Sequence, residues 1–291
     1  MRSIKLEFGE LVTKWRAARK MNQTDLSEVA GVSTRHISFL ENGRADPSRE
    51  MVGILADSFG LSNREKNALY LSAGYAAKYS ETAFDSPALF EVRASLQAFI
   101  DQQNPFPISI HNRYWRVVMH NRALAVTLLH FLGAEKFRRA YKDLSMAKLL
   151  FDPEGMRPYV KNWSTLARRI VNRMLHEASL TTDPNMQTAL NDILNQPDIP
   201  KRWARPLEEE EMGILSPIHI SDQHYDLRFM FCTTTLNYAE DVTIQELRIE
   251  SYVPADLDTR MQLERLTNDP ELLAIVADQM EVCSCRTFPS R

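Results

Sequence analysis

The segment from Gln23 to Gly43 constrains the fold of this 291-residue chain more than any other part of its sequence. Apolar residues recur at helical spacing in two short runs. Gly31 stands between the runs, where a residue free to adopt positive φ can end a helix. The positions spaced to lock two such helices together are Leu26, Ala30, Val32, Ile37 and Leu40. The pattern therefore predicts two short helices joined by a tight turn.

Polar residues suited to cap helices divide the first 78 residues into five predicted helices. Ahead of the pair, apolar residues between Phe8 and Trp15 fall at helical spacing and predict a first helix. Ser62, with Glu65 three residues later, predicts a capping box at the start of the last helix. The residues expected to cap the second to fifth helices are Asn22, Ser33, Ser48 and Ser62. We expect residues 1–78 to form one mainly α domain.

The second helix of the pair would present short polar side chains and one arginine from its N-terminal half. Such donors and acceptors suit the base edges of a DNA major groove. Groups at the start of the first helix, and just past the second, can reach phosphates on either side. The candidate DNA-binding residues are Gln23, Thr24, Ser33, Thr34, Arg35, Ser38, Asn42 and Arg44.

The formal charge of the whole chain, -3, argues by itself against nucleic-acid binding. The charge is unevenly distributed, however: residues 1–78 hold twelve basic and nine acidic residues, a balance of +3, and the remainder carries −6. A basic face is common on solvated helices, so charge alone decides little. Together with the helix pair, the local excess of positive charge favours contact with phosphates.

Residues 8–61 resemble the Cro/repressor-type helix-turn-helix of the XRE family. The positions that carry the resemblance are Gln23, Leu26, Ala30, Gly31, Val32, Ser33, Ile37, Ser38, Glu41 and Gly43, with Arg44 and Pro47 following. The resemblance implies a sequence-specific DNA-binding domain. A helical hairpin without a ligand is the alternative that the pattern leaves open.

The remaining sequence predicts a second, α+β domain, in which an antiparallel sheet is accompanied by helices. Residues 79–104 are expected to form a linker and a bridging helix, and residues 105–291 the domain itself. A hairpin is expected from strands at 108–110 and 115–119, followed by helices within 121–194. Three further strands are expected at 214–220, 225–235 and 243–252, and a tail helix at 270–280.

Motifs for catalysis, metal binding or export are not evident in this sequence, and we expect neither enzymatic activity nor a metal or cofactor. His219 and His224 have no matching pair of ligands, and Cys283 and Cys285 are too close for a zinc knuckle. The acidic run at 208–211 is more typical of a solvated loop than of a cation site. Three sparse cysteines, no apolar run long enough to span a membrane and no export signal indicate a cytoplasmic protein.

The second domain resembles the ligand-binding domain of the MmyB-like regulators, over roughly residues 8–255 when the helix-turn-helix is included. The resemblance rests on Arg113, Trp115, Asn121, Arg122, Ala123, Leu149, Leu150, Phe151, Asn162, Trp163, Ala167, Arg168, Trp203, Ala204, Arg205, Ser216 and Pro217. It implies a PAS-like domain that binds a fatty-acid-like molecule. The candidate ligand-binding residues that it implies are Arg113, Trp115, Asn121, Arg122 and Trp163. The acidic run at 208–211 and the tail after residue 256 depart from the family pattern.

These features lead to the hypothesis of a DNA-binding regulator that responds to a small apolar ligand. A homodimer would place two helices bearing Arg35 in successive major grooves of double-stranded DNA, about 34 Å apart. A ligand carboxylate would be met by Arg113 or Arg122. The sequence also leaves open an ordinary filled core, a hydrolase fused to a DNA reader, and an antitoxin-like scaffold that binds a protein partner.

Overall fold

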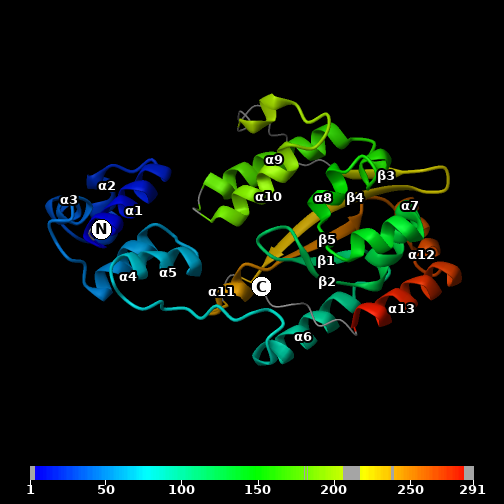
Figure 1. Cartoon of the computed structure of the whole chain (residues 1–291), viewed down its shortest axis with the longest axis horizontal. Coiled ribbons are helices and arrows are strands. Elements are labelled where there is room, and N and C mark those ends of the chain that lie inside the picture. Colours follow the sequence, from blue (N-terminus) through cyan, green and yellow to red (C-terminus); the bar gives the residue numbers. More distant parts are fainter. Residues whose placement is uncertain (1–3, 180, 182, 206–216, 237–238, 285–291) are drawn as a thin grey trace. The chain divides into compact units, whose positions relative to one another are not determined.

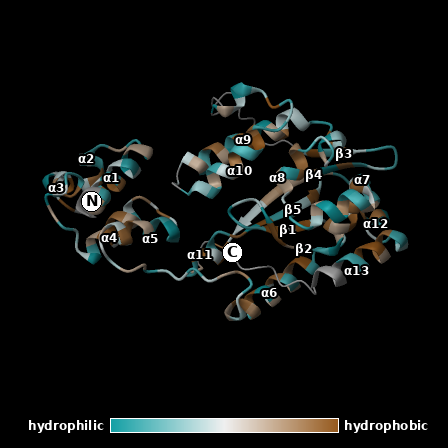
Figure 2. Cartoon of the chain, in the orientation of Figure 1, coloured by the Kyte–Doolittle hydropathy of each residue, from teal (hydrophilic) through white to brown (hydrophobic). Residues whose placement is uncertain are grey.

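A computed structural model of the chain describes all residues except 1–3, 180, 182, 206–216, 237–238 and 285–291 (Figure 1). The chain forms two compact units. The first consists of Met1–Ala83 together with Asn237–Gln245, and the second of Phe84–Leu236 together with Glu246–Arg291. Their helices carry both hydrophilic and hydrophobic stretches (Figure 2), as expected of helices that bury one face.

The first unit contains the five predicted helices and one short helix from a distant part of the chain. These helices are α1 (Ile4–Ala18), α2 (Gln23–Ala30), α3 (Thr34–Glu41), α4 (Arg49–Ser58), α5 (Asn63–Ser72) and α11 (Val242–Gln245). All four predicted caps are confirmed, since each side chain accepts a hydrogen bond from a backbone N–H in the first turn of its helix. Gly31 ends α2 with φ at 67°, in the left-handed region that favours glycine.

The helices of the first unit pack closely around an apolar core. Phe8, Leu26, Ile37 and Leu40 are almost completely buried in it. Helices α1 and α3 approach so closely at Gly9 that a Cβ atom there would lie 2.3 Å from the carbonyl oxygen of Glu41. The predicted helix pair, α2 and α3, is therefore held in a fixed geometry against α1.

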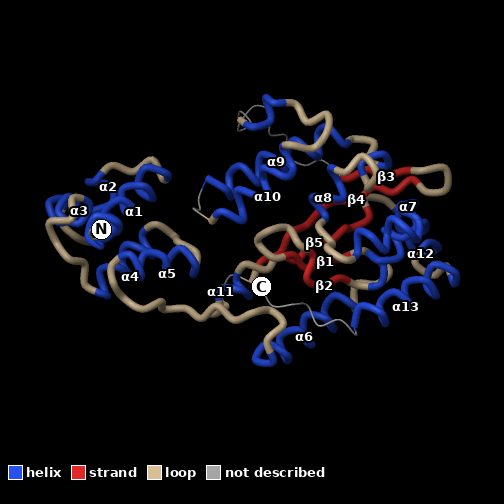
Figure 3. Tube along the Cα trace, viewed as in Figure 1, coloured by secondary structure: helices blue, strands red, loops and turns tan. Residues whose placement is uncertain are grey.

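The second unit is built on one antiparallel sheet surrounded by helices (Figure 3). The strands among its described residues are β1 (Ile108–His111), β2 (Val117–His120), β3 (Ile218–Ser221), β4 (Asp226–Thr235) and β5 (Arg248–Pro254), in the order β2-β1-β5-β4-β3. Its α-helices are α6 (Phe90–Asp101), α7 (Arg122–Tyr141), α8 (Met146–Phe151), α9 (Trp163–Ser179), α10 (Pro184–Leu194), α12 (Leu257–Leu266) and α13 (Pro270–Ser284). Short 3-10 turns lie at Pro87–Leu89, Arg157–Tyr159 and Lys201–Ala204. The predicted fold of helical domain plus α+β domain is confirmed.

Two predicted strands begin later than expected, because polar side chains bind the backbone ahead of them. The carboxylate of Asp241 accepts hydrogen bonds from the N–H groups of Thr243 and Ile244, and α11 forms where the last strand was expected to begin. In the hairpin, the side-chain oxygen of Asn112 accepts hydrogen bonds from the backbone N–H groups of Tyr114 and Arg116. The resulting turn holds Trp115 outside the strand. Helix α12 was not predicted, and residues 214–216 of the third expected strand lie outside the described residues.

Candidate functional site

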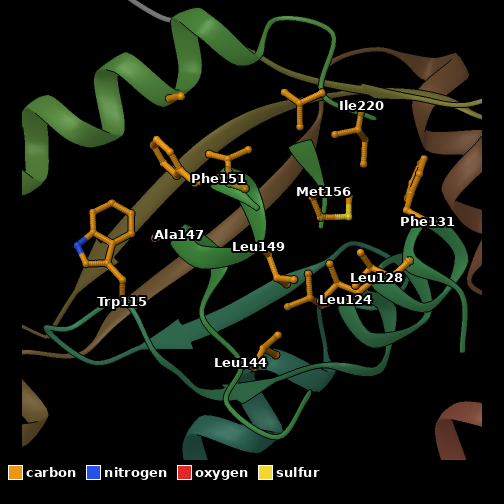
Figure 4. Close-up of a cluster of buried hydrophobic side chains, with 14 of the residues drawn as sticks. Trp115, Leu124, Leu128, Phe131, Leu144, Ala147, Leu149, Phe151, Met156 and Ile220 are labelled. Carbon is orange, nitrogen blue, oxygen red and sulfur yellow. The ribbon is translucent and has the colours of Figure 1, made fainter. Parts of the chain in front are cut away.

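A cavity of about 260 Å³ lies inside the second unit, among α7, α8, α9 and strands β3 to β5. Most of the side chains around it are apolar. Several of them belong to the buried cluster in Figure 4, among them Leu124, Leu128, Ala147, Met156 and Ile220. A cavity with apolar walls and a few polar groups is the usual form of a small-molecule site.

Four polar side chains of helix α9 and strand β5 also line this cavity. Arg169 and Arg173 are four residues apart on α9 and therefore project from the same side of the helix. Glu250 and Tyr252 are two residues apart on β5 and therefore share one face of the sheet. A Nη atom of Arg173 lies 3.8 Å from the carboxylate of Glu250, so the helix and the strand meet through opposite charges. We refer to these four residues as the polar end of the cavity.

The carboxylate of Glu250 is only 3% exposed and is held by a buried histidine as well as by Arg173. Nε2 of His111, which is 2% exposed, lies 3.1 Å from Glu250 and 2.7 Å from the hydroxyl of Ser109. Burial raises the pKa of Tyr252 far above its ordinary value, and the charge of Glu250 adds to this effect. The Tyr252 hydroxyl therefore stays neutral and can donate a hydrogen bond at the polar end.

Glu177, on α9, joins the cavity to the beginning of strand β5. Its carboxylate accepts hydrogen bonds from Nε1 of Trp115 at 3.3 Å and from Nε of Arg173 at 3.1 Å. It also forms an ion pair of 2.9 Å with Arg248, the first residue of β5. The guanidinium of Arg173 lies over the indole ring of Trp115, 4.9 Å from its centroid. Two residues that line the cavity and one strand terminus therefore depend on a single carboxylate.

Trp115 is the one predicted ligand residue that lines this cavity. It is 5% exposed, and its φ of 63° is in a region that bulky L residues rarely adopt. A conformation of this kind costs on the order of 1–3 kcal/mol, persists only where the surroundings enforce it, and is common at ligand sites. The hydrogen bond from the indole to Glu177 and the stacked Arg173 are part of that enforcement.

The other four predicted ligand residues lie away from the cavity. The side chain of Asn121 is buried and bonded to the backbone at the start of α7, while that of Arg122 is exposed. Arg113 forms an ion pair of 2.8 Å with Glu246. Trp163 donates a hydrogen bond of 2.8 Å from its indole N–H to a backbone oxygen in α8, and its ring lies beside that of Trp203 at a tilt of 32°. None of these four residues is among those that line the cavity.

The predicted DNA-binding residues lie along α2, α3 and the turn after α3. Six of them are exposed: Thr24, Ser33, Thr34, Arg35, Asn42 and Arg44. Arg35 lies over the ring of Phe39, 5.1 Å from its centroid, so its position on α3 is supported by packing within the helix. Ser33 is occupied as the cap of α3, and the side-chain amide of Asn42 donates to the backbone oxygen of Ser38 at 2.8 Å.

Gln23, at the first position of α2, is half-buried and bound to Glu41 at the end of α3. Its amide donates a hydrogen bond of 2.7 Å to the carboxylate of Glu41. The same carboxylate receives two hydrogen bonds from Arg16 of α1, at 2.6 and 3.0 Å. Glu41 therefore ties α1, α2 and α3 together, and the Gln23 side chain contributes to this lock.

The histidines considered as metal ligands do not converge in the part of the chain that the structure describes. His219 pairs with Asp226, and the ring of His224 lies beside that of His130. Among the described residues no group of three metal-ligating side chains occurs. Cys232 is a free, exposed thiol. The acidic run at 208–211 and Cys285 lie outside the described residues, as does the side chain of Cys283.

No described helix is both long enough and apolar enough to cross a membrane.

Two family models match the chain. Residues 92–266 match the model of the MmyB-like transcription regulator ligand binding domain, and residues 12–64 match a helix-turn-helix model. Both describe domains of regulators rather than of enzymes.

Among solved structures, the chain is similar to the apo form of the competence regulator ComR from Streptococcus vestibularis. The two share 14% sequence identity over 69% of this chain and 67% of that chain, with a TM-score of 0.21. A likeness this low carries no argument about the present fold. Among curated proteins, no relative matches the chain.

Proposed function

The chain belongs to the MmyB-like transcription regulators, and from this premise we propose that a fatty-acid-like ligand in the cavity alters its affinity for DNA. The supporting observation is the cavity itself, whose walls are apolar and whose polar end holds Arg169 and Arg173. An acyl chain would lie along the apolar walls, and its carboxylate would meet the guanidinium groups. This assigns the carboxylate to the arginines of α9 in place of Arg113 and Arg122.

Mass spectrometry of the intact chain under native conditions tests this proposal directly. We expect a co-purifying molecule of acyl-chain mass, and exchange for palmitate when palmitate is added. The variant Ala147→Leu places extra methyl groups in the cavity, because Ala147 lines it and is 3% exposed. It should lose palmitate binding, whereas Ala88→Leu on the surface should keep it. Equal palmitate binding by both variants would refute the assignment of the cavity.

We further propose that α3 is the recognition helix and that Arg35 reads a base. A bidentate contact between arginine and guanine contributes about 1–3 kcal/mol of discrimination, which is a loss of roughly 5- to 150-fold in affinity when removed. Arg35→Ala should therefore weaken binding to a selected duplex and relax the sequence preference at one position. Arg64→Ala, which removes the same charge from α5, should leave that preference unchanged. An unchanged preference in both variants would exclude Arg35 as a reader.

The remaining residues of the proposed DNA surface are Gln23, Thr24, Ser33, Thr34, Ser38, Asn42 and Arg44.

We also propose that the protein acts in the cytoplasm as a homodimer. We propose in addition that its second unit is PAS-like, as its antiparallel sheet with helices suggests. Two recognition helices in a dimer would protect two half-sites about 34 Å apart. Footprinting on a selected duplex checks this spacing, and protection of a single half-site would contradict the dimer.

A further inference from the structure

The connection between β4 and β5 leaves the second unit and returns to it. β4 ends at Thr235 and β5 begins at Arg248, and residues 239–245 between them belong to the first unit, which contains the helix-turn-helix and is called the DNA-binding unit below. Both flanking strands line the cavity, β4 through Phe229 and Phe231 and β5 through Glu250 and Tyr252. The chain therefore runs from one wall of the cavity into the DNA-binding unit and back to another wall.

Hydrogen bonds and burial anchor this connection within the DNA-binding unit. Asn63, the first residue of α5, donates from its side chain to the carbonyl oxygen of Ala239 at 2.9 Å and from its backbone to Oε1 of Gln245 at 2.7 Å. Between these two points, the side chain of Val242 is completely buried. The segment is thus held at both ends and in the middle.

Asp241 makes several polar contacts from within the connection. Its carboxylate accepts hydrogen bonds from the hydroxyl of Ser80 at 2.9 Å and from the backbone N–H of Thr82 at 3.0 Å. It also accepts a hydrogen bond from the N–H of Thr243 at 2.9 Å, at the start of α11. One carboxylate therefore joins the connection to the chain that follows the helix-turn-helix.

On the cavity side, the connection ends at residues that are tied to Glu177. Arg248 begins β5 three residues after Gln245, and its guanidinium pairs with the carboxylate of Glu177. The same carboxylate holds Trp115 and Arg173 of the cavity lining. A ligand that moves either of these side chains must change the hydrogen bonds of Glu177, and so the support of Arg248.

We propose that the β4–β5 connection couples the cavity to the DNA-binding unit, with Glu177 as the positioning residue that links cavity occupancy to it. The inference rests on the proposed function, because it concerns how ligand binding reaches DNA. A ligand changes DNA affinity only through its different affinities for two arrangements of the protein. The bonds of Glu177 and Asp241 are the contacts that differ between those arrangements.

The test compares the full-length variants Asp241→Ala and Glu240→Ala with the natural chain. Glu240 is an exposed acid in the same connection and serves as the matched control. The DNA affinity of each protein is measured by fluorescence anisotropy on a duplex selected by the natural chain, with and without saturating palmitate. Palmitate affinity is measured separately by calorimetry. Coupling between two ligands of one protein typically amounts to 5- to 150-fold.

Asp241→Ala should bind palmitate as the natural chain does, while the effect of palmitate on DNA affinity falls to about one-fold. Glu240→Ala should retain the full effect. Glu177→Gln should also lose the effect, and Glu177→Asp should restore part of it, which a purely structural role would not produce. If Asp241→Ala does not fold, Ser80→Ala removes one of its bonds and is measured in the same way.

Undiminished coupling in Asp241→Ala, or in Ser80→Ala if that variant replaces it, would overturn the inference and leave the proposed function intact. An absence of any palmitate effect on the natural chain, despite palmitate binding, would instead refute the proposed function. The effect of palmitate on the DNA affinity of the natural chain distinguishes these two outcomes, because it is present in the first and absent in the second. Loss of coupling in Glu240→Ala as well would show that the connection responds to any change of charge, and would overturn the specific role of Asp241.

Discussion

Replacing Asn121 by alanine should destabilise the second unit rather than simply weaken ligand binding. The side chain is fully buried, and its oxygen accepts hydrogen bonds from the N–H groups of Leu124 at 3.1 Å and Ile108 at 3.3 Å. Its nitrogen donates to the carbonyl oxygens of Phe106 at 2.8 Å and Ile100 at 3.3 Å. One amide therefore joins the start of α7, strand β1 and the end of α6.

The magnitude of this loss follows from two contributions. Loss of the cap of α7 costs about 1 kcal/mol. Each buried backbone group left without a partner costs about 1–3 kcal/mol, although a relaxed structure can satisfy some of them. Counting one such group fully gives a loss of about 2–4 kcal/mol in the free energy of unfolding. This is a large share of the 5–15 kcal/mol that is typical of a folded domain.

Urea denaturation followed by tryptophan fluorescence measures this loss, because three of the four tryptophans, Trp115, Trp163 and Trp203, lie in the second unit. Arg122→Ala is the matched control, since this neighbour is exposed and should change stability by less than about 0.5 kcal/mol. A loss below about 1 kcal/mol in Asn121→Ala, combined with lost palmitate binding, would refute the structural role and return Asn121 to the ligand site.

Two further predictions concern one contact in each unit. Gly9→Ala should destabilise the first unit by about 1–3 kcal/mol, since its Cβ would overlap the backbone of Glu41, and the thermal transition of that unit measures the loss. Burial by itself would raise the pKa of Asp222, but hydrogen bonds from the N–H groups of His224 and Tyr225 outweigh it and hold that pKa below its ordinary value. Asp222 therefore stabilises the fold above the unfolded-state pKa of about 4, and this contribution is lost as the pH falls through the lower folded-state pKa. In the variant Asp222→Asn, the melting temperature should fall less steeply as the solution is made acidic.

The helix-turn-helix could be predicted from the sequence because its signals are local. Three of the caps are serines, whose side chains accept a hydrogen bond from the backbone N–H three residues later: Ser33, Ser48 and Ser62. The start of each of these helices can therefore be identified from a few neighbouring residues. Gly31 adopts positive φ at the position where the apolar pattern stops. Signals that involve three or four consecutive residues need no knowledge of the rest of the fold.

The short helix α11 could not be predicted in the same way, because its environment is not local. Thr243 and Ile244 are β-branched, and the pattern around them favours a strand. Val242 is buried, and the bonds of Asp241 to Ser80 and Thr82 join chain segments about 160 residues apart. Tertiary contacts here overrule local propensity.

The cavity was only partly predictable for a related reason. Trp115 is a candidate from the family resemblance, and it lines the cavity. Arg169 and Arg173 were missed, since two arginines four residues apart on a helix are more typical of a solvated face. Glu250 and Tyr252 alternate along a predicted strand, which indicates a shared face but not which face meets a cavity. Packing of α9 over the sheet decides all four positions.

The charges around the cavity connect the affinity of a ligand with its signal. Arg173 already interacts with Glu177 and Glu250, so an anionic head group that binds Arg173 must compete with two carboxylates of the protein. The cost of that competition lowers the apparent affinity of the ligand. The same competition changes the contacts of Glu177, whose carboxylate also pairs with Arg248 at the beginning of β5. Under the proposed coupling, this change in the contacts of Glu177 reaches the connection to the DNA-binding unit. We therefore expect a ligand without an anionic group to fill the cavity with little effect on DNA affinity.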